Sequence, residues 1–235
     1  MTNKYEFAGI CVEISHIYPY FAQQAQNYLS DGTPKFSIAV TQADLDRERR
    51  NEENAEAAED YLESLVIYRQ LCEKLVDHNV ILFHSAAIRA DGKAYLFTAP
   101  SGTGKSTHIK LWRKRYGKAI GIINGDKPLI SVTADEIRAW GTPWDGKEHW
   151  SKNVSAPIAG ICQLGRGAEN VITPVSAGDA LSMLFAQTYR PSTAEGMTKT
   201  VQLLAQIAQR VPVWHLECNM SIEAAEVSYA AMKGE

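Results

Sequence analysis

The stretch "FTAPSGTGKSTHIKLW", residues 97–112, constrains the fold more than any other part of the chain. Residues 99–106 fit the phosphate-loop pattern, with alanine in place of the first glycine. Gly102 and Gly104 let backbone N–H groups turn inward and form a nest for phosphate oxygens, and the following helix adds its positive end. Lys105 can then reach the β- and γ-phosphates as a point charge. The stretch therefore predicts a nucleotide-binding loop.

A phosphate loop also needs an acidic residue near the metal ion, usually at the end of a neighbouring strand. The run "AIGIIN" predicts such a strand, and Asp126 follows it closely. Ser106, directly after the loop lysine, carries the hydroxyl that usually shares the ion. The sequence thus predicts Ser106 and Asp126 as Mg²⁺ ligands, and a plain turn aspartate is the alternative for Asp126.

The strand before the loop is predicted to belong to a hairpin. The runs "VILFHSAAIRA" and "KAYLFTAP" are apolar and strand-like, and Asp91-Gly92 joins them with a strong hairpin signal. The second run leads into the phosphate loop, so its strand should pair antiparallel with its predecessor. A parallel arrangement would need a crossover of about a dozen residues or more. This pattern argues against small-metabolite kinases that begin with strand, loop and helix.

The first 79 residues predict a small α+β region. "YEFAGICVEI" and "KFSIAV" are typical of short strands, with an aromatic helical stretch between them. Residues 42–60 are dense in charges of both signs, which indicates a solvated helix or a linker. Apolar residues from Ala58 to Val76 then recur at three- and four-residue steps, which predicts one amphipathic helix.

Residues 80–235 predict an α/β domain with a mixed sheet around the P-loop. Downstream of the loop, the apolar pattern predicts these elements: strands "AIGIIN", "PLISVT", "EIRAW", "APIAGICQL" and "VPVWHLE", helices over about 177–189 and 195–209, and a last helix capped by Ser221.

Composition narrows the classes of function. The net charge of −3 gives no support to non-specific nucleic-acid binding, which needs a basic surface. No run of about 18 apolar residues predicts a membrane span, and the first residues lack the apolar centre of a signal peptide. The four cysteines lie far apart without paired spacing, which is typical of reduced, buried thiols. We therefore expect a cytoplasmic protein with no nucleic-acid or membrane partner.

At this point the residues resemble a known family. His84 in "FHSA", the hairpin, "APSGTGKST" and a strand followed by an acid resemble the bacterial HPr serine kinase/phosphorylase and its relatives with the phosphoenolpyruvate-carboxykinase type of P-loop fold. The resemblance covers about residues 80–129. The stretch from "GTPWDGKEHWSKN" through "QTYRP" is similar to stand-alone kinase-like proteins of the same superfamily, including those found beside peptide-modification systems.

The resemblance implies Mg²⁺-dependent phosphoryl transfer from ATP, or sometimes another phosphate donor, to a serine hydroxyl. The acceptor would be a serine-containing protein, a peptide or free serine. The family often forms oligomers, which implies a homo-oligomer, although no feature of this chain indicates an interface. Carried over to matching positions, the catalytic roles fall on His84, Lys105 and Asp126. The nucleotide contacts fall on Ser101, Gly102, Thr103, Gly104, Lys105, Ser106 and Thr107.

One departure from the family pattern concerns the general base. The family usually has two adjacent aspartates after the strand, and the first is generally taken as the base for the serine hydroxyl. Here the pair reads Gly125-Asp126. The chain is therefore a slow kinase, a kinase with another base such as His84 or Asp145, or a nucleotide-binding pseudo-kinase that recognises a peptide or protein. A small-metabolite P-loop kinase is the further alternative.

The loop "GTPWDGKEHWSKN" is a second candidate for chemistry. Lys147 or Lys152 could hold phosphates, and a tryptophan could stack on a base. A surface loop with aromatic anchors explains the same residues. Arg166 and Arg190 are further candidate contacts, and both also fit ordinary surface positions.

Overall fold

The computed structural model describes residues 1–51 and 54–234. The chain forms two compact units, Met1–His78 and Asn79–Glu235, and each is described here by itself. The boundary predicted from the sequence lies after residue 79. Glu52 and Glu53, from the charged segment 42–60, lie outside the described residues. In the part of the chain that is described, no helix combines the length and the apolar composition needed to cross a bilayer.

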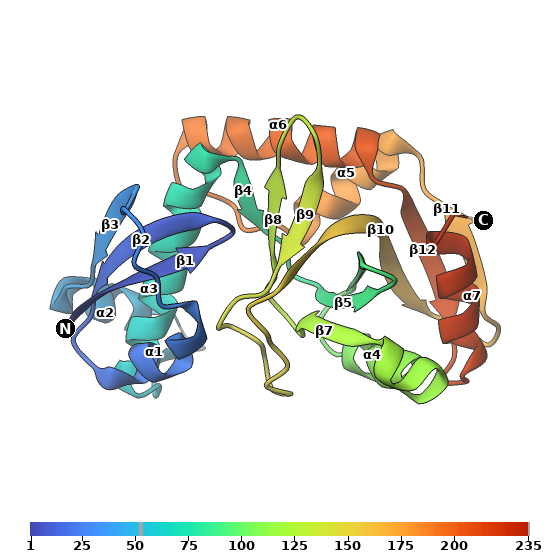
Figure 1. Cartoon of the computed structure of the whole chain (residues 1–235), viewed down its shortest axis with the longest axis horizontal. Helices are drawn as coiled ribbons and strands as arrows, with labels where there is room; N and C mark the ends of the chain where they lie inside the picture. Colours follow the sequence, from blue (N-terminus) through green and yellow to red (C-terminus); the bar gives the residue numbers. More distant parts are fainter. Residues whose placement is uncertain (52–53, 235) are drawn as a thin grey trace. The chain divides into compact units, whose positions relative to one another are not determined.

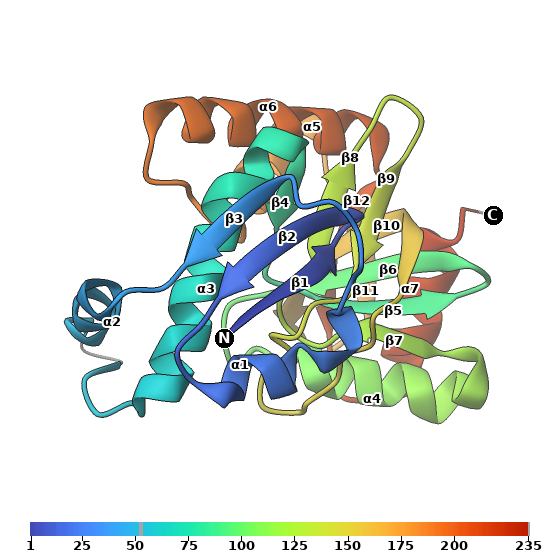
Figure 2. The same ribbon diagram turned by 60° about the vertical axis from the view of Figure 1, so that its left-hand side comes forward.

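The first unit is a three-stranded sheet with helices packed against it (Figure 2). Strand β2 pairs antiparallel with β1 and parallel with β3. The elements are β1 (Thr2–Phe7), β2 (Ile10–Ser15), α1 (Pro19–Gln24), η1 (Gln26–Tyr28), β3 (Phe36–Ala39), α2 (Gln42–Arg49), α3 (Glu59–Leu75) and η3 (Val76–His78). Helix α3 lies across one face of the sheet and buries Leu62, Ile67 and Leu71, so the amphipathic helix predicted there is confirmed.

The prediction of one strand over "YEFAGICVEI" is wrong. Ala8 and Gly9 both adopt positive φ, at 52° and 78°, and they turn the chain back between β1 and β2. The pair is therefore a hairpin of the kind that needs left-handed backbone at both turn positions. Alanine is uncommon in that conformation, so the residues at this turn hardly indicate it.

The second unit is built on a nine-stranded mixed sheet (Figure 1). Its strands are β4 (Val80–Leu82), β5 (Ala86–Ala90), β6 (Lys93–Thr98), β7 (Gly121–Asn124), β8 (Leu129–Val132), β9 (Ile137–Trp140), β10 (Ser155–Arg166), β11 (Val171–Pro174) and β12 (Val213–Cys218). They follow the order β4-β8-β9-β10-β6-β5-β7, with β12 also on β10 and β11 on β12. The long strand β10 is antiparallel to β9 at its beginning and parallel to β6 and β12 further on. This change of partner curls the sheet.

The hairpin predicted before the phosphate loop is confirmed. Strands β5 and β6 pair antiparallel, with Ala90 opposite Lys93 across the two-residue turn. Asp91 and Gly92 adopt φ of 49° and 76°, as a type I′ turn requires. The other edge of β6 pairs parallel with β10, so the sheet around the loop is mixed, as predicted.

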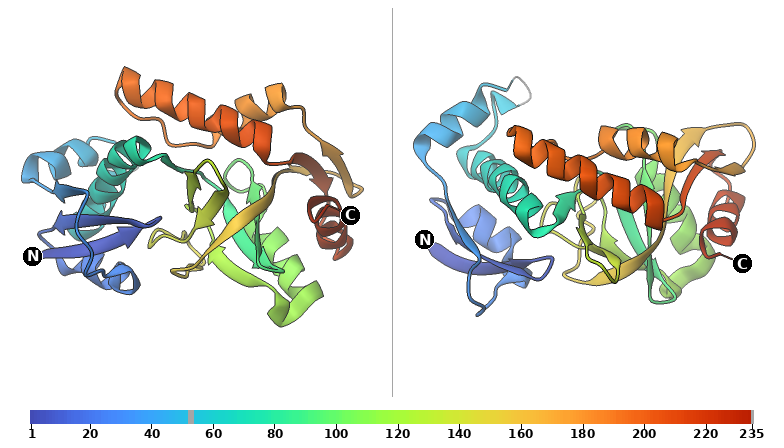
Figure 3. Two further views of the ribbon diagram at one scale, coloured as in Figure 1. Left: turned by 45° about the horizontal axis from the view of Figure 1, so that its top comes forward. Right: turned by 90° about the horizontal axis from the view of Figure 1, so that it is seen from above.

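Two pairs of helices cover the sheet of the second unit (Figures 1 and 3). The helices are α4 (Lys105–Tyr116), η4 (Gly117–Ala119), α5 (Ala177–Ala186), α6 (Ala194–Arg210) and α7 (Glu223–Met232). Helix α4 packs against α7 on one side, and α5 packs against α6 on the other. Trp112 of α4 is fully buried between Phe97, Tyr95 and Tyr229, so α4 is fixed firmly to the sheet.

The predicted Ser221 cap of the last helix is wrong. Ile222 is the N-cap of α7, without a side-chain hydrogen bond, and the Ser221 hydroxyl instead contacts the Asn170 amide at 3.0 Å. The four cysteines are free thiols, and Cys11, Cys72 and Cys162 are buried. This state agrees with the expectation of reduced cysteines.

Candidate functional site: a phosphate loop beside a histidine, a lysine and an aspartate

The loop between β6 and α4 has the backbone that its glycines predict. Gly102 has φ of 77° and Gly104 has φ of 125°, conformations that side chains disfavour. A Cβ at either position would meet nothing within 4 Å, so the requirement for glycine comes from the backbone conformation and not from crowding. The Thr103 N–H donates to the Pro100 carbonyl at 3.2 Å and closes the turn. Ser106 and Thr107 follow in the first turn of α4.

Lys105, the first residue of α4, folds its side chain back over the loop. Its Nζ lies 3.2 Å from the Ala99 carbonyl oxygen and 3.3 Å from His84 Nε2. Burial lowers the pKa of Lys105, and the charge of Asp126 opposes that shift. The lysine is therefore a partly desolvated cation, and an anionic ligand would relieve the cost of its burial.

His84 lies where one predicted strand is interrupted. The run "VILFHSAAIRA" forms two strands, β4 and β5, and residues 83–85 belong to neither. Strand β4 pairs with β8, whereas β5 pairs with β6 and β7. The His84 N–H donates to the Gln187 carbonyl at 2.7 Å, and the Ser85 N–H donates to the Asp126 carbonyl at 3.1 Å. The break therefore holds the imidazole beside the connection between β7 and β8.

The His84 imidazole contacts both of the other predicted catalytic residues. Its Nε2 lies 3.1 Å from Asp126 Oδ1 as well as 3.3 Å from Lys105 Nζ. Its Nδ1 lies 3.2 Å from Gln187 Oε1. Nε2 either donates a hydrogen to Asp126 or accepts one from Lys105, and it cannot do both at once. The three residues thus form a cluster in which a proton has more than one place to reside.

Asp126 is placed by a turn built on Asn124. The Asn124 Oδ1 accepts from the N–H of Asp126 at 2.8 Å and of Lys127 at 2.6 Å, while its Nδ2 donates to Thr142 and Trp144. Burial would raise the pKa of Asp126. The hydrogen bond with His84 and the charge of Lys127, which lies 3.6 Å away, outweigh burial and hold this pKa below its ordinary value. Asp126 is therefore an ionised carboxylate.

The donor set suits a magnesium ion that is held mainly by substrate phosphates. The described residues contain no cluster of three or more His, Cys, Asp or Glu side chains that could hold a metal. Magnesium commonly uses only one or two carboxylates together with water and phosphate oxygens. The Asp126 carboxylate, with the Ser106 hydroxyl as the second candidate, is of that kind.

The segment 144–153 packs onto the turn that carries Asp126. Trp150 lies under the cations of Lys110 and Arg113 of α4, at 5.6 and 5.9 Å from its ring centroid. A Cβ on Gly146 would lie 2.9 Å from Asp126 Cβ, so this glycine allows close approach to the carboxylate. Burial raises the pKa of Asp145, and His149, 3.5 Å away, opposes the shift. The segment is therefore an anchored loop beside the cluster.

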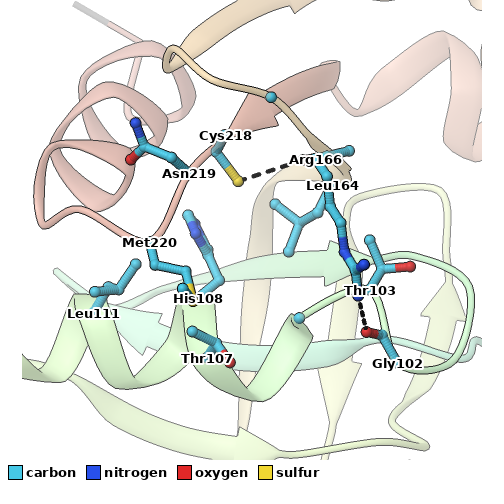
Figure 4. A pocket seen from close by; sticks show the side chains of 13 residues that line it. Gly102, Thr103, Thr107, His108, Leu111, Leu164, Arg166, Cys218, Asn219 and Met220 are labelled. Atoms are coloured by element: carbon cyan, nitrogen blue, oxygen red, sulfur yellow. Dashed lines mark hydrogen bonds between the residues drawn. The ribbon is translucent and has the colours of Figure 1, made fainter.

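A cavity of about 470 Å³ adjoins the phosphate loop (Figure 4). It lies between the loop, helix α4, the end of β10 and the segment after β12. Among the candidate residues named from the sequence, the following line it: Gly102, Thr103, Gly104, Thr107 and Arg166. His84, Lys105 and Asp126 are not among its lining residues.

Sequence reasoning missed two residues that organise the cluster. Asn124 had a usable signal, because asparagine before Gly-Asp is typical of a side-chain-to-backbone turn. Gln187 had none, since it follows α5 and reaches His84 only through the tertiary fold, 103 residues along the chain.

Comparison with known proteins adds little to this geometry. No protein-family model matches the chain, and no curated protein matches it. Among solved structures, the HPr(Ser) kinase/phosphatase from Coxiella burnetii aligns with a TM-score of 0.36 and 9% identity, over 65% of this chain and 99% of that one. A likeness of this size does not decide the function.

Proposed function

We propose that the protein is an ATP- and Mg²⁺-dependent phosphotransferase that acts on a serine hydroxyl. The observation that carries the proposal is the cluster of Lys105, His84 and Asp126, with contacts of 3.1 and 3.3 Å, beside the glycine loop that precedes α4. A cation, a proton carrier and a carboxylate beside a nest of backbone N–H groups are the groups that phosphoryl transfer uses.

Each residue has a role that follows from its chemistry. The loop N–H groups and Lys105 bind the phosphate chain and offset its negative charge. Asp126 and Ser106 would hold the magnesium ion, which supplies further charge neutralisation when bound. In the transfer, the serine oxygen forms a bond to the terminal phosphorus as the bond to the bridging oxygen breaks and ADP leaves. The hydroxyl proton passes to a basic group, for which His84 Nε2 is the first candidate and Asp145 the second.

The test is transfer of labelled phosphate. Protein should be incubated with Mg²⁺ and ATP labelled in the terminal phosphate, with serine-containing peptides, free serine and water as acceptors. Lys105→Ala should lose transfer and binding together, whereas His84→Gln should lose transfer and retain binding. Transfer to small metabolites, with none to any serine acceptor, would replace the serine proposal with the metabolite-kinase alternative.

A binding module without catalysis is the second candidate, and one observation favours it. Gly125 occupies the position of the family's usual base, and Asp145 and Trp150 pack against it. A general base contributes about 10²- to 10⁴-fold to rate, whereas nucleotide binding does not require one. Tight nucleotide binding without turnover of any acceptor or of water would favour this candidate.

A further inference from the structure

The cavity beside the phosphate loop has a polar end and an apolar end. Thr103, Gly104 and Thr107 lie at the end formed by the loop and the start of α4. Apolar surface comes from Leu111 of α4, Leu164 of β10 and Met220 of the segment after β12 (Figure 4). A volume of about 470 Å³ lies within the range of pockets that enclose small-molecule ligands.

The charge of the cavity suits an anionic ligand. Its lining contains no Asp or Glu among the described residues, and Arg166 is the one cation among the lining residues. The Arg166 Nη2 donates to the Gly102 carbonyl at 2.8 Å, which places the guanidinium beside the phosphate loop. The cationic group therefore lies at the end of the cavity where a phosphate chain would leave the loop.

The polar groups at the apolar end are already engaged. The Asn219 side chain accepts from the Ser221 N–H at 2.9 Å and donates to the Ala168 carbonyl at 2.8 Å. Along the wall of the cavity that joins the two ends, the backbone of β10 at residues 165–166 is paired in register with β12 at residues 217–218. A site distinguishes ligands strongly when it offers polar groups built to bond them, and this end of the cavity offers mainly apolar surface.

We propose that this cavity binds the nucleoside of a nucleoside triphosphate between Leu111, Leu164 and Met220, with little discrimination between adenine and guanine. The inference rests on the proposed function, because it takes the phosphates to lie on the loop. Met220 is 80% exposed and extends toward α4, so it covers a bound base without contributing to the core. The base gains affinity by burying apolar surface, and the phosphates set its orientation.

The test compares three ligands in calorimetric titrations with Mg²⁺ present: ATP, GTP and inorganic tripolyphosphate. Tripolyphosphate carries the phosphate chain without a nucleoside. We expect ATP and GTP to bind within about fivefold of each other, and tripolyphosphate at least about tenfold more weakly than ATP. Met220→Ala should weaken ATP and GTP by about three- to tenfold and leave tripolyphosphate unchanged. The matched control is Val171→Ala, because Val171 is an exposed apolar residue of β11 that does not line the cavity.

The outcomes separate this inference from the proposed function. Equal affinity for ATP and tripolyphosphate, or a hundredfold preference for one purine, would overturn the nucleoside assignment while leaving the loop as a phosphate site. Loss of affinity for a serine peptide, but not for ATP, in Met220→Ala would assign the cavity to the acceptor instead. If none of the three ligands binds, the proposed function fails together with the inference that rests on it.

Discussion

The backbone N–H of Gly125 donates a hydrogen bond to the carbonyl oxygen of Trp150 at 2.6 Å. This contact brings the segment 144–153 onto residue 125, directly before Asp126. A Cβ at residue 125 would lie 3.1 Å from the Asp145 carbonyl oxygen and 3.2 Å from Trp150 Cβ. The segment 144–153 can therefore pack this closely because residue 125 carries no side chain.

Gly125→Asp is expected to destabilise the protein, because the neighbouring loop must shift by a few tenths of an ångström to admit a side chain. Overpacking of this kind costs about 1–3 kcal/mol, and the new carboxylate also lies beside that of Asp126. Chemical denaturation should show the loss for Gly125→Ala and a larger loss for Gly125→Asp. We expect ATP hydrolysis not to rise in Gly125→Asp. Wild-type stability and faster hydrolysis in Gly125→Asp would contradict this prediction. They would show that the loop moves aside without a loss in the free energy of unfolding.

The same contact can be tested by a double-mutant cycle. Trp150→Ala keeps the Cβ that faces residue 125 but removes the indole ring, which contacts Lys110 and Arg113 of α4. The loop therefore loses its attachment to α4 and becomes easier to displace. The penalty of Gly125→Asp should then shrink by about 1 kcal/mol in the Trp150→Ala background. Strictly additive effects of the two substitutions would contradict the packing described here.

Asp126→Asn should weaken nucleotide binding only when Mg²⁺ is present. The amide keeps the shape of the carboxylate and loses the charge that would attract the ion. We expect the affinity for ATP with Mg²⁺ to fall by about ten- to hundredfold, and the affinity in a chelator to stay within about twofold. Titration of both forms with ATP checks this, with Asp135→Asn in the turn between β8 and β9 as the control. An equal loss with and without Mg²⁺ would assign Asp126 a purely structural role.

Stability should fall in acid because of His108. Burial lowers the pKa of His108 to about 3 from its ordinary 6.5, so between these values the unfolded chain binds a proton that the folded chain does not. The free energy of unfolding should therefore decrease as pH falls through this window, by up to about 1.4 kcal/mol per pH unit from this residue. Denaturation at pH 7.5 and 5 measures the slope, in the absence of nucleotide.

His108→Gln should flatten that slope, since glutamine does not titrate and can still accept from the Trp112 indole, which lies 3.1 Å from His108 Nε2. His149→Gln, at an exposed position in the segment 144–153, should keep the wild-type slope. An unchanged slope in His108→Gln would mean that other groups carry the acid sensitivity.

Local signals predicted the parts of the site that are close together in sequence. The Asp91-Gly92 turn and the glycines at 102 and 104 each require a special backbone, so the residues themselves identify the hairpin and the loop. The β4–β8 and β11–β12 pairings and the cavity lining depend on long-range packing, which periodicity does not encode. The break at His84 was missed for the same reason: an apolar run reads as one strand, and only the change of pairing partner interrupts it.

The nucleotide site is tested most directly by the thermal stability of the protein with and without nucleotide. ATP or ADP with Mg²⁺ should raise the melting temperature, because a ligand that binds only the folded state stabilises it. Lys105→Ala should remove most of that rise, since it deletes the cation that lies 3.3 Å from His84 Nε2 at the phosphate loop, while Lys118→Ala, outside the site in η4, should keep it. If millimolar nucleotide leaves the melting temperature of the wild-type protein unchanged, the central claim that this loop binds a nucleotide is wrong.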